Sequence, residues 1–449
     1  MYKENLIKLS SLWNFLFLLL IPALLFNLEI NFSGISASGD ERIGHSASLD
    51  GDILVSNQSQ QIGIKFFDIL SLFMLSIFYF LIKSNGYKIK IPYKKPLLSY
   101  LFFTLICLIS ILVNYNLYTS SQLIVCILYF LKLIQISFLF FFIKIYFEYG
   151  GTGSQILNVV TISVFFGGLL GISDTLIQSI FNVRLFSSII PDRVQYYGII
   201  LLMLAYMSIQ LTNISPENFS NKRKILLIIS FIVGVISVFM CGKRTILLAL
   251  IFLMLYAISK FKMTISAKFL VFTIFFLGAL TLPLVVNFET TFQRDSESLS
   301  AGLSEDYAYE IDNSALGNVE VSGLDYSLTE RLAKWVKSAG LIRQSPIIGT
   351  GYWGSPYAHN FLPDNGIFQV AVEMGLLGLF SLLFFLYVSS KTPLKKSKRD
   401  IYNSRRIILP IILIVISLTA NPFYIFNLMA VYLILIFGWI ERFNNKIRL

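Results

Sequence analysis

The chain has 449 residues, of which 56% are hydrophobic and only 14% are charged, and its net charge at pH 7 is +11. A soluble protein carries about twice that fraction of charged residues, so this composition excludes the soluble classes. Together with a mean hydropathy of +0.73, it predicts an all-α polytopic membrane protein, because spans in lipid must satisfy their backbone hydrogen bonds internally.

Apolar runs predict about twelve transmembrane helices in chain order. We expect them near residues 12–28, 64–82, 97–114, 123–143, 156–172, 194–212, 225–241, 245–259, 269–286, 366–388, 407–421 and 423–440. The first run is long enough to remain in the membrane, so no cleavable signal peptide is expected. The chain then divides into an N-terminal transmembrane bundle (1–286), a large periplasmic loop (287–365) and a C-terminal region of three transmembrane spans with a short cytoplasmic tail (366–449).

Basic residues set the orientation of these spans. Most of the 36 lysines and arginines fall on one side, with the densest cluster between Lys391 and Arg406. That side is the cytoplasmic one by the positive-inside rule, so both termini are expected in the cytoplasm. The net charge is then a topology signal that favours anionic membrane lipid, and no nucleic-acid partner is expected. Two long loops, 29–63 and 287–365, lie on the outer face.

The second of these loops changes character along its length. Its first part, from Asp295 to Asp325, is acidic and rich in Ser and Gly, so we expect a variable segment. The stretch from Asp325 to Ser345 instead predicts an amphipathic helix at the membrane surface. Its apolar stripe would be Leu332, Trp335 or Val336, Ala339 and Ile342, and its polar side would carry Arg331, Lys334 and Lys337.

Several cations stand at predicted membrane boundaries on the outer face. Lys243 and Arg244 join two spans with almost no loop between them, and Arg331 begins the amphipathic helix. Arginine is costly at such depth and binds phosphate through two parallel hydrogen bonds, which favours an anionic partner. An anchor that snorkels to lipid headgroups, or a solvated surface charge, is the alternative. Weaker candidates of the same kind are Arg184, Arg193 and Arg343.

One of only two histidines, His359, lies with Asn360 before the span that begins near 366. An imidazole titrates near neutral pH and can act as a general base, although a loop histidine bonded to backbone is equally compatible. Glu373 lies inside that span, where a carboxylate needs partners, so we expect a helix-packing or hydrogen-bonding role. Gly375 and Gly378 follow at a spacing that favours close helix contact.

Aromatic residues cluster before the histidine: Tyr352, Trp353 and Tyr357. They are candidates for stacking on sugar rings, and an interfacial aromatic belt is the alternative. The outer face has no acidic pair with metal-like spacing, so no catalytic metal is expected. The chain also lacks phosphate-binding loops and dinucleotide fingerprints, so no cofactor is expected.

Three motifs carry a family resemblance: Cys241-Gly-Lys-Arg-Thr245, Glu330-Arg-Leu-Ala-Lys-Trp335 before Ser345-Pro-Ile-Ile-Gly-Thr-Gly-Tyr352, and Ala358-His-Asn-Phe-Leu362 before Glu373-Met-Gly-Leu-Leu-Gly378. In this order the chain resembles the O-antigen polymerase and O-antigen ligase superfamily of bacterial envelope glycosyltransferases. The resemblance is densest from Cys241 to Leu379.

The resemblance implies a GT-C-like, metal-independent glycosyltransferase of the inner membrane, with its active site on the periplasmic side. It implies a glycan donor linked to undecaprenyl diphosphate and catalytic roles for Arg244, Arg331 and His359. Beside these, we expect substrate contacts from the following candidates: Lys243, Arg193, Arg343, Asn360, Tyr352 and Trp353. The family usually has a small residue where Lys243 stands, which leaves open a second phosphate contact there.

Three functions fit these features. A polymerase, which joins two undecaprenyl-diphosphate-linked oligosaccharides, is favoured by the Phe- and Ile-rich composition and by the long segment from Asp295 to Asp325. A ligase would instead transfer the glycan to lipid A-core. A lipid-linked sugar transporter would place its charges near mid-span rather than at one face. For a polymerase, membrane lipid and a chain-length regulator protein are the expected partners.

Overall fold

The computed structural model describes most of the chain, namely residues 2–26, 29–38, 59–85, 91–181, 186, 193–213, 221–241, 244–260, 308–313, 317–322, 326–355, 363, 365–391, 407–418 and 426–445. The predicted span near 269–286 and much of the predicted variable segment lie outside these residues.

Helices build the body of the molecule. They are α1 (Tyr2–Phe26), α2 (Phe66–Asn85), α3 (Lys94–Val113), η2 (Tyr115–Leu117), α4 (Ser120–Ser137), α5 (Leu139–Glu148), α6 (Gly153–Phe181), α7 (Arg193–Asn213), α8 (Asn221–Met240), α9 (Arg244–Lys260), α12 (Tyr326–Gln344), α14 (Gly366–Lys391), α16 (Ile408–Ser417) and α17 (Phe426–Asn445). The helical class predicted for this body is confirmed.

Two antiparallel hairpins occur where only loops were expected. One pairs β1 (Glu29–Ser38) with β2 (Ser59–Lys65), and the other pairs β3 (Ala308–Asn313) with β4 (Gly317–Ser322). The strands are short and polar, and the pairing of such strands depends on their register rather than on an apolar run that the sequence displays. The all-α prediction is therefore wrong for these two segments, which form hairpins outside the helical body.

Eleven of the twelve predicted spans coincide with apolar helices in the described ranges. Five of these are long and apolar enough to cross a bilayer by themselves: Lys94–Val113, Gln122–Glu148, Gly153–Gln178, Asn221–Met240 and Gly366–Lys391. Two further apolar helices, α9 with 17 residues and α16 with 10 residues, are short for a bilayer about 30 Å thick. The chain is a multi-pass membrane protein, and the number of twelve spans stays a prediction.

Two helices, α7 and α17, form the centre of the bundle. From Tyr196 to Ile209 nearly every apolar side chain of α7 is at most 2% exposed, and the same holds from Leu428 to Ile440 of α17. A helix that is buried all round must be covered by other helices, and α17 indeed packs against α1, α4, α5, α6, α7 and α16. The core therefore runs through the middle of the bundle.

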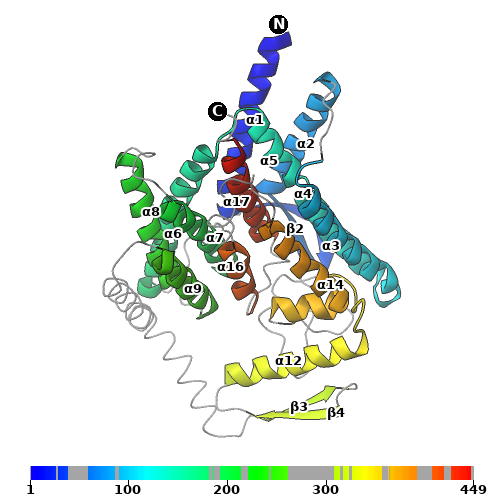
Figure 1. The fold of residues 1–449 in the computed structure, drawn as a ribbon. Helices are drawn as coiled ribbons and strands as arrows, with labels where there is room; N and C mark the ends of the chain where they lie inside the picture. Colours follow the sequence, from blue (N-terminus) through cyan, green and yellow to red (C-terminus); the bar gives the residue numbers. More distant parts are fainter. Residues whose placement is uncertain are drawn as a thin grey trace.

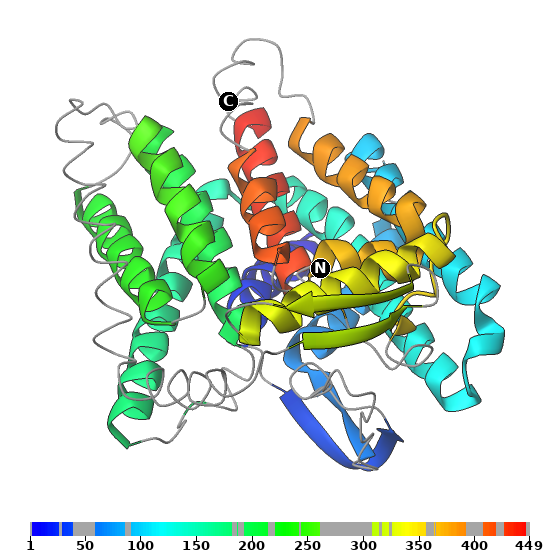
Figure 2. The same ribbon diagram turned by 90° about the horizontal axis from the view of Figure 1, so that it is seen from below.

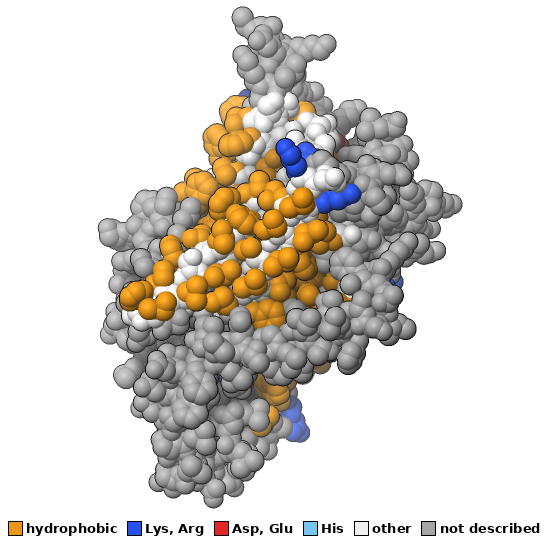
Figure 3. All heavy atoms as spheres, turned by 90° about the vertical axis from the view of Figure 1, so that its left-hand side faces the viewer, with side chains coloured by type: hydrophobic (Ala, Val, Ile, Leu, Met, Phe, Trp, Pro, Cys, Tyr) orange, Lys and Arg blue, Asp and Glu red, His pale blue; other side chains and the backbone are white. Residues whose placement is uncertain are grey.

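The outer helices present apolar side chains to their surroundings. Figure 3 shows a broad hydrophobic face, with Lys and Arg side chains gathered towards its upper edge. On α8, the exposed apolar residues follow directly after the exposed Lys222 and Arg223. They are Ile225, Leu226, Ile228, Ile229, Ile232 and Ile236. An apolar surface of this extent bordered by cations is typical of a lipid-facing surface with headgroup anchors.

The end of the molecule opposite both termini carries α12. In Figures 1 and 2 this helix lies across the end of the bundle, with the hairpin β3–β4 along its outer side. It packs against α14 on one side and against β3 and β4 on the other. In Figure 1 the first turns of α1 and the last turns of α17 both lie towards the end of the molecule opposite α12, which agrees with the prediction that both termini lie on one side of the membrane.

The helix predicted between Asp325 and Ser345 is confirmed, but its predicted faces are not. Lys334 is 7% exposed and Ser338 is fully buried, whereas Ala339 is exposed. Leu341 packs with Val372 of α14. Because α12 is covered by both α14 and the hairpin, part of its polar side is buried. The apolar stripe predicted to face the membrane surface therefore does not coincide with the buried side of the helix.

Candidate functional site

Three of the predicted arginines lie within helices. Arg193 is the first residue of α7, Arg244 is the first residue of α9, and Arg331 is the sixth residue of α12. For these three arginines the structure describes the backbone only. Three further predicted site residues lie outside the described residues, as do Arg184 and Tyr357: Lys243, His359 and Asn360.

The two helices that begin with arginine pack against each other: α7 contacts α9. The first turn of a helix presents unpaired backbone N–H groups and the positive end of the helix dipole. An arginine at that position adds a formal positive charge to these groups. A helix start of this kind can bind an anionic ligand such as phosphate.

The segment Ser345–Ser355, here called the motif loop, joins α12 to the predicted histidine motif. It packs into a break in α14, where Gly375 has φ 67° and ψ −175°. The loop replaces the helical hydrogen bonds that this break removes. The bonds run from Thr350 N to Val372 O (2.9 Å), from Gly351 N to Glu373 O (2.9 Å), from Leu376 N to Pro346 O (2.8 Å) and from Leu377 N to Ile347 O (3.3 Å).

Two glycines make this insertion possible. A Cβ added at Gly349 would stand 2.5 Å from the backbone of Glu373, and a Cβ at Gly375 would collide with the backbone of Ile347. Both residues also have positive φ, 75° at Gly349 and 67° at Gly375, which only glycine adopts readily. The small-residue pattern predicted contact between helices here, whereas at Gly375 the close contact is with the motif loop.

The last two turns of α3 and the turn that follows hold the motif loop from the other side. Ser110 Oγ donates to Ile348 O (2.9 Å) and to Glu373 O (2.6 Å). Asn114 Nδ2 donates to Gly349 O at 3.2 Å, and the hydroxyl of Tyr118 donates to Thr350 O at 2.6 Å. Side chains more than 230 positions away in the chain therefore satisfy the carbonyls of the loop.

The carboxylate of Glu373 binds the end of the motif loop. Its side chain is fully buried. Its Oε2 accepts the backbone N–H of Trp353 at 2.7 Å, and its Oε1 accepts from Ser355 Oγ at 2.7 Å and Gln369 Nε2 at 3.1 Å. The hydrogen-bonding role predicted for Glu373 is confirmed, and charge-assisted bonds of this kind are stronger than neutral ones.

Trp353 has an unusual backbone. Its φ is 59°, a region that costs a bulky L-residue about 1–2 kcal/mol. Its ring stacks on Tyr129 of α4 with centroids 4.1 Å apart, and Tyr129 stacks in turn on Phe426 at 5.8 Å. Trp353 is half-buried, whereas Tyr352 is 1% exposed and belongs to the core. Between these two rings, Trp353 is the one with exposed surface for a ligand.

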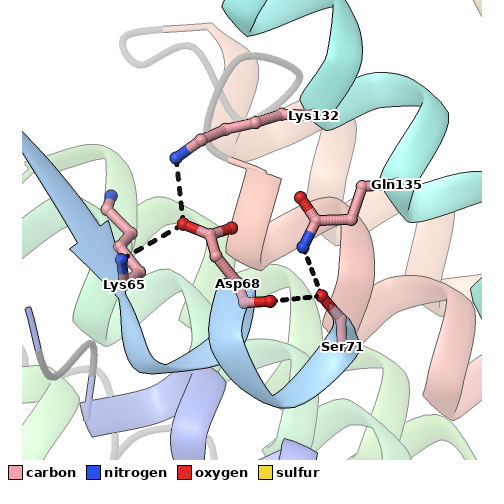
Figure 4. A network of polar contacts seen from close by, with 5 residues as sticks. All are labelled: Lys65, Asp68, Ser71, Lys132 and Gln135. Atoms are coloured by element: carbon pink, nitrogen blue, oxygen red, sulfur yellow. Dashed lines mark hydrogen bonds and ion pairs between the residues drawn. The ribbon is translucent and has the colours of Figure 1, made fainter. Parts of the chain in front are cut away.

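A second polar cluster lies where α2 and α4 meet (Figure 4). The ammonium of Lys132, inside a predicted span, lies 3.4 Å from Asp68 Oδ2. Asp68 also accepts the backbone N–H of Lys65 at 3.1 Å, and Gln135 Nε2 donates to Ser71 Oγ in the same network. Lys132 Nζ stands 5.9 Å from the ring centre of Phe426, so this cluster adjoins the aromatic stack that ends at Trp353.

The start of α14 and the end of α12 frame the histidine motif in the sequence. Asn365 caps α14 through Oδ1, which accepts from Ile367 N (2.9 Å) and Phe368 N (3.3 Å). The ring of Phe368 lies 6.0 Å from that of Trp335 on α12. Arg343, in the last turn of α12, is exposed. The described residues on either side of the motif, Ser355 and Asn365, are thus both held by hydrogen bonds to α14.

Sequence reasoning missed the residues that support the loop. Ser110, Asn114 and Tyr118 lie at and just after the end of an apolar run and share no motif with the loop. Their only signal is that they are polar residues in and just after a predicted span, which is too common to identify a site.

Residues 226–383 match a family model described as O-antigen ligase. No curated protein matches the chain. The matched segment contains Arg244, Arg331 and His359, and it includes the motif loop and the break in α14. The match agrees with the resemblance drawn from the three motifs and associates the chain with polysaccharide-related glycosyl transfer.

Proposed function

We propose that this multi-pass membrane protein, whose residues 226–383 match the O-antigen ligase family, is a polymerase of a bacterial surface polysaccharide. It joins oligosaccharide units carried on undecaprenyl diphosphate, at the periplasmic face of the inner membrane, within a GT-C-like arrangement of helices. The observation that carries the proposal is the family match, because all three motif residues, Arg244, Arg331 and His359, lie inside it.

Diphosphate binding is the first task of such an enzyme. We assign it to Arg244 and Arg331, with Lys243, Arg193 and Arg343 as further cations. Support comes from the starts of α7 and α9, since each combines an arginine with the positive end of a helix dipole and the two helices are in contact. Cations at that position stabilise the negative charge that develops on the departing diphosphate.

The transfer step follows from these assignments. The acceptor hydroxyl attacks the anomeric carbon of the donor from the side opposite the diphosphate. A new glycosidic C–O bond forms while the C–O bond to the diphosphate breaks, so the anomeric configuration inverts and undecaprenyl diphosphate leaves. His359 accepts the proton of the hydroxyl, Asn360 binds the acceptor, and Trp353 offers a ring for sugar contact. The step requires no metal or cofactor.

The choice of acceptor separates the two enzyme functions. A polymerase is supported by the long segment between Asp295 and Asp325, part of which forms strands packed on α12 and suits recognition of a particular repeat unit. A ligase, which transfers the glycan to lipid A-core, is the second candidate because it is the activity that the family description names. A chain-length regulator is an expected partner of the polymerase alone.

Deletion and complementation test the function. We expect the deletion strain to carry a single repeat unit on lipopolysaccharide core, and bare core with accumulated lipid-linked polymer would indicate a ligase instead. Complementation with Arg244→Ala, Arg331→Ala or His359→Ala should fail to restore long chains at equal protein levels. Arg223→Ala, an exposed arginine at the start of α8, is the control and should complement fully. Normal chains in all three site variants would refute the site assignment.

A further inference from the structure

The carboxylate of Glu373 is the point at which the end of the motif loop is held. Its donors include the Trp353 backbone and the Ser355 hydroxyl, which belong to the loop, and Gln369, which lies one turn earlier on α14. A buried carboxylate is costly unless such donors compensate it, and an apolar side chain would fill the same space without that cost. The carboxyl group at this position therefore indicates a requirement other than packing.

The two parts of the motif loop are held differently. Its first part, Pro346–Gly351, is bound by backbone hydrogen bonds across the break in α14 and by side chains of and just after α3. Its last part, Trp353–Ser355, is hydrogen-bonded to the side chain of Glu373 in α14. Removal of that side chain should therefore loosen the last part and leave the first part in place.

The last part is also the strained part. Trp353 has φ 59°, and its N–H points to Glu373 Oε2 at 2.7 Å. Glu373 therefore stabilises a backbone conformation that a tryptophan does not otherwise favour. Strained residues that the surroundings hold in place are found preferentially at functional sites. Ser355, the next residue held by Glu373, stands four positions before His359 in the sequence.

We propose that Glu373 is a positioning residue for glycosyl transfer: it fixes the Trp353–Ser355 turn in its strained conformation, and through this turn it sets the geometry of the transfer step without touching the substrate. The inference rests on the proposed function. It adds to the arginine and histidine motifs a carboxylate that acts through the backbone of the loop.

The test uses the full-length protein in proteoliposomes with the lipid-linked glycan extracted from the deletion strain. Hydrogen exchange of the peptide that contains Trp353–Ser355 measures whether Glu373 holds this turn in place. The kcat and KM of glycosyl transfer measure whether holding the turn matters for the reaction. The variants are Glu373→Ala, Glu373→Gln and Ser355→Ala. The matched control is Ser381→Ala, which removes a buried hydroxyl on the same helix that bonds only its own turn, at Gly378 O.

Glu373→Ala should raise exchange at Trp353–Ser355 but not in α3, and should lower kcat by about tenfold or more with little change in KM, since misplacement rather than lost binding is the defect. Glu373→Gln should restore part of both, because an amide oxygen still accepts the Trp353 N–H. Ser355→Ala should raise exchange and lower kcat in the same way but by less. It tests the proposal even if Glu373→Ala does not fold. Ser381→Ala should match wild type.

Unchanged exchange at Trp353–Ser355 in Glu373→Ala would contradict the claim that Glu373 holds this turn in place. Raised exchange with wild-type kcat would overturn its role in transfer, while the proposed function would stand. Wild-type protein that transfers no glycan, from a gene whose deletion leaves surface polysaccharide unchanged, would instead remove the proposed function and this inference with it. The failures of the two proposals are therefore distinguishable.

Discussion

Gly375 of α14 and Ile347 of the motif loop meet backbone to backbone, with no room for a Cβ between them. The contact lets a loop complete the hydrogen bonding of a broken helix: the N–H groups after the break bind Pro346 and Ile347, and the carbonyls before it accept from Thr350 and Gly351. Non-helical backbone at membrane depth is tolerated where protein supplies such partners. The break in α14 thus provides the hydrogen-bonding groups that attach the motif loop to this helix.

Replacement of Gly375 by alanine should destabilise the protein strongly. The new Cβ would meet the backbone of Ile347, and φ 67° with ψ −175° is a conformation open almost only to glycine. Gly150→Ala is the matched control, because Gly150 also has positive φ (83°) but a Cβ there meets nothing within 4 Å. In thermal unfolding of detergent-solubilised protein, we expect the midpoint of Gly375→Ala to fall well below that of Gly150→Ala. Equal midpoints would show that the close contact is not required.

Ser110→Ala should lower the free energy of unfolding by about 1 kcal/mol. Its hydroxyl bonds the carbonyls of Ile348 and Glu373, two separate segments, so the variant leaves a buried carbonyl without this donor. Ser99→Ala is the control on the same helix, since the Ser99 hydroxyl is also buried but bonds only Pro96 O in its own turn. Chemical unfolding of both variants measures the difference. A control as destabilised as Ser110→Ala would mean that the link to the loop adds nothing.

The Lys132–Asp68 pair should show a measurable coupling energy. The pair is 3.4 Å apart, with side chains 29% and 16% exposed, so solvent screens it only in part and we expect about 0.5–1 kcal/mol. A double-mutant cycle of Lys132→Met and Asp68→Asn measures it. The Asn variant removes the charge, while its amide oxygen still accepts the Lys65 N–H.

The reference for this cycle is the pair Lys144–Glu148, which is 3.6 Å apart and has side chains 26% and 31% exposed. As an i,i+4 pair within one helix it should couple by about 0.3 kcal/mol. A Lys132–Asp68 coupling no larger than this would show that joining α2 to α4 gives the pair no additional strength.

Tyr118 should make the protein sensitive to alkaline pH. Burial is the main cause that raises the pKa of its phenol well above the usual 10, and its hydroxyl donates to Thr350 O. Above about pH 10 the unfolded chain loses this proton while the folded protein keeps it, so stability falls as pH rises through that range. Between pH 8 and pH 10.5, Tyr118→Phe should therefore lose less of its unfolding free energy than wild type. An equal loss in both proteins would contradict the assignment.

Much of the helical body could be predicted from the sequence, because a run of apolar residues long enough for a bilayer admits few structures other than a helix. The polar segment between Asp325 and Ser345 was also correctly predicted as helical, but its faces were not. Lys334 is buried and Ala339 is exposed because α12 is covered by a hairpin and by α14, and local periodicity does not show what will cover a helix.

What the sequence by itself determined is the membrane class, most of the helices and the motifs that the family match contains. Each of these depends on residues close together in the chain. Tertiary structure alone decided that Ser110, Tyr118 and Glu373 hold one loop, since these residues lie up to 263 positions apart and come together only when α3 and α14 pack. The break at Gly375 has the same origin, because a glycine in an apolar run permits a kink, but only the inserted loop, by replacing the lost hydrogen bonds, makes that kink stable.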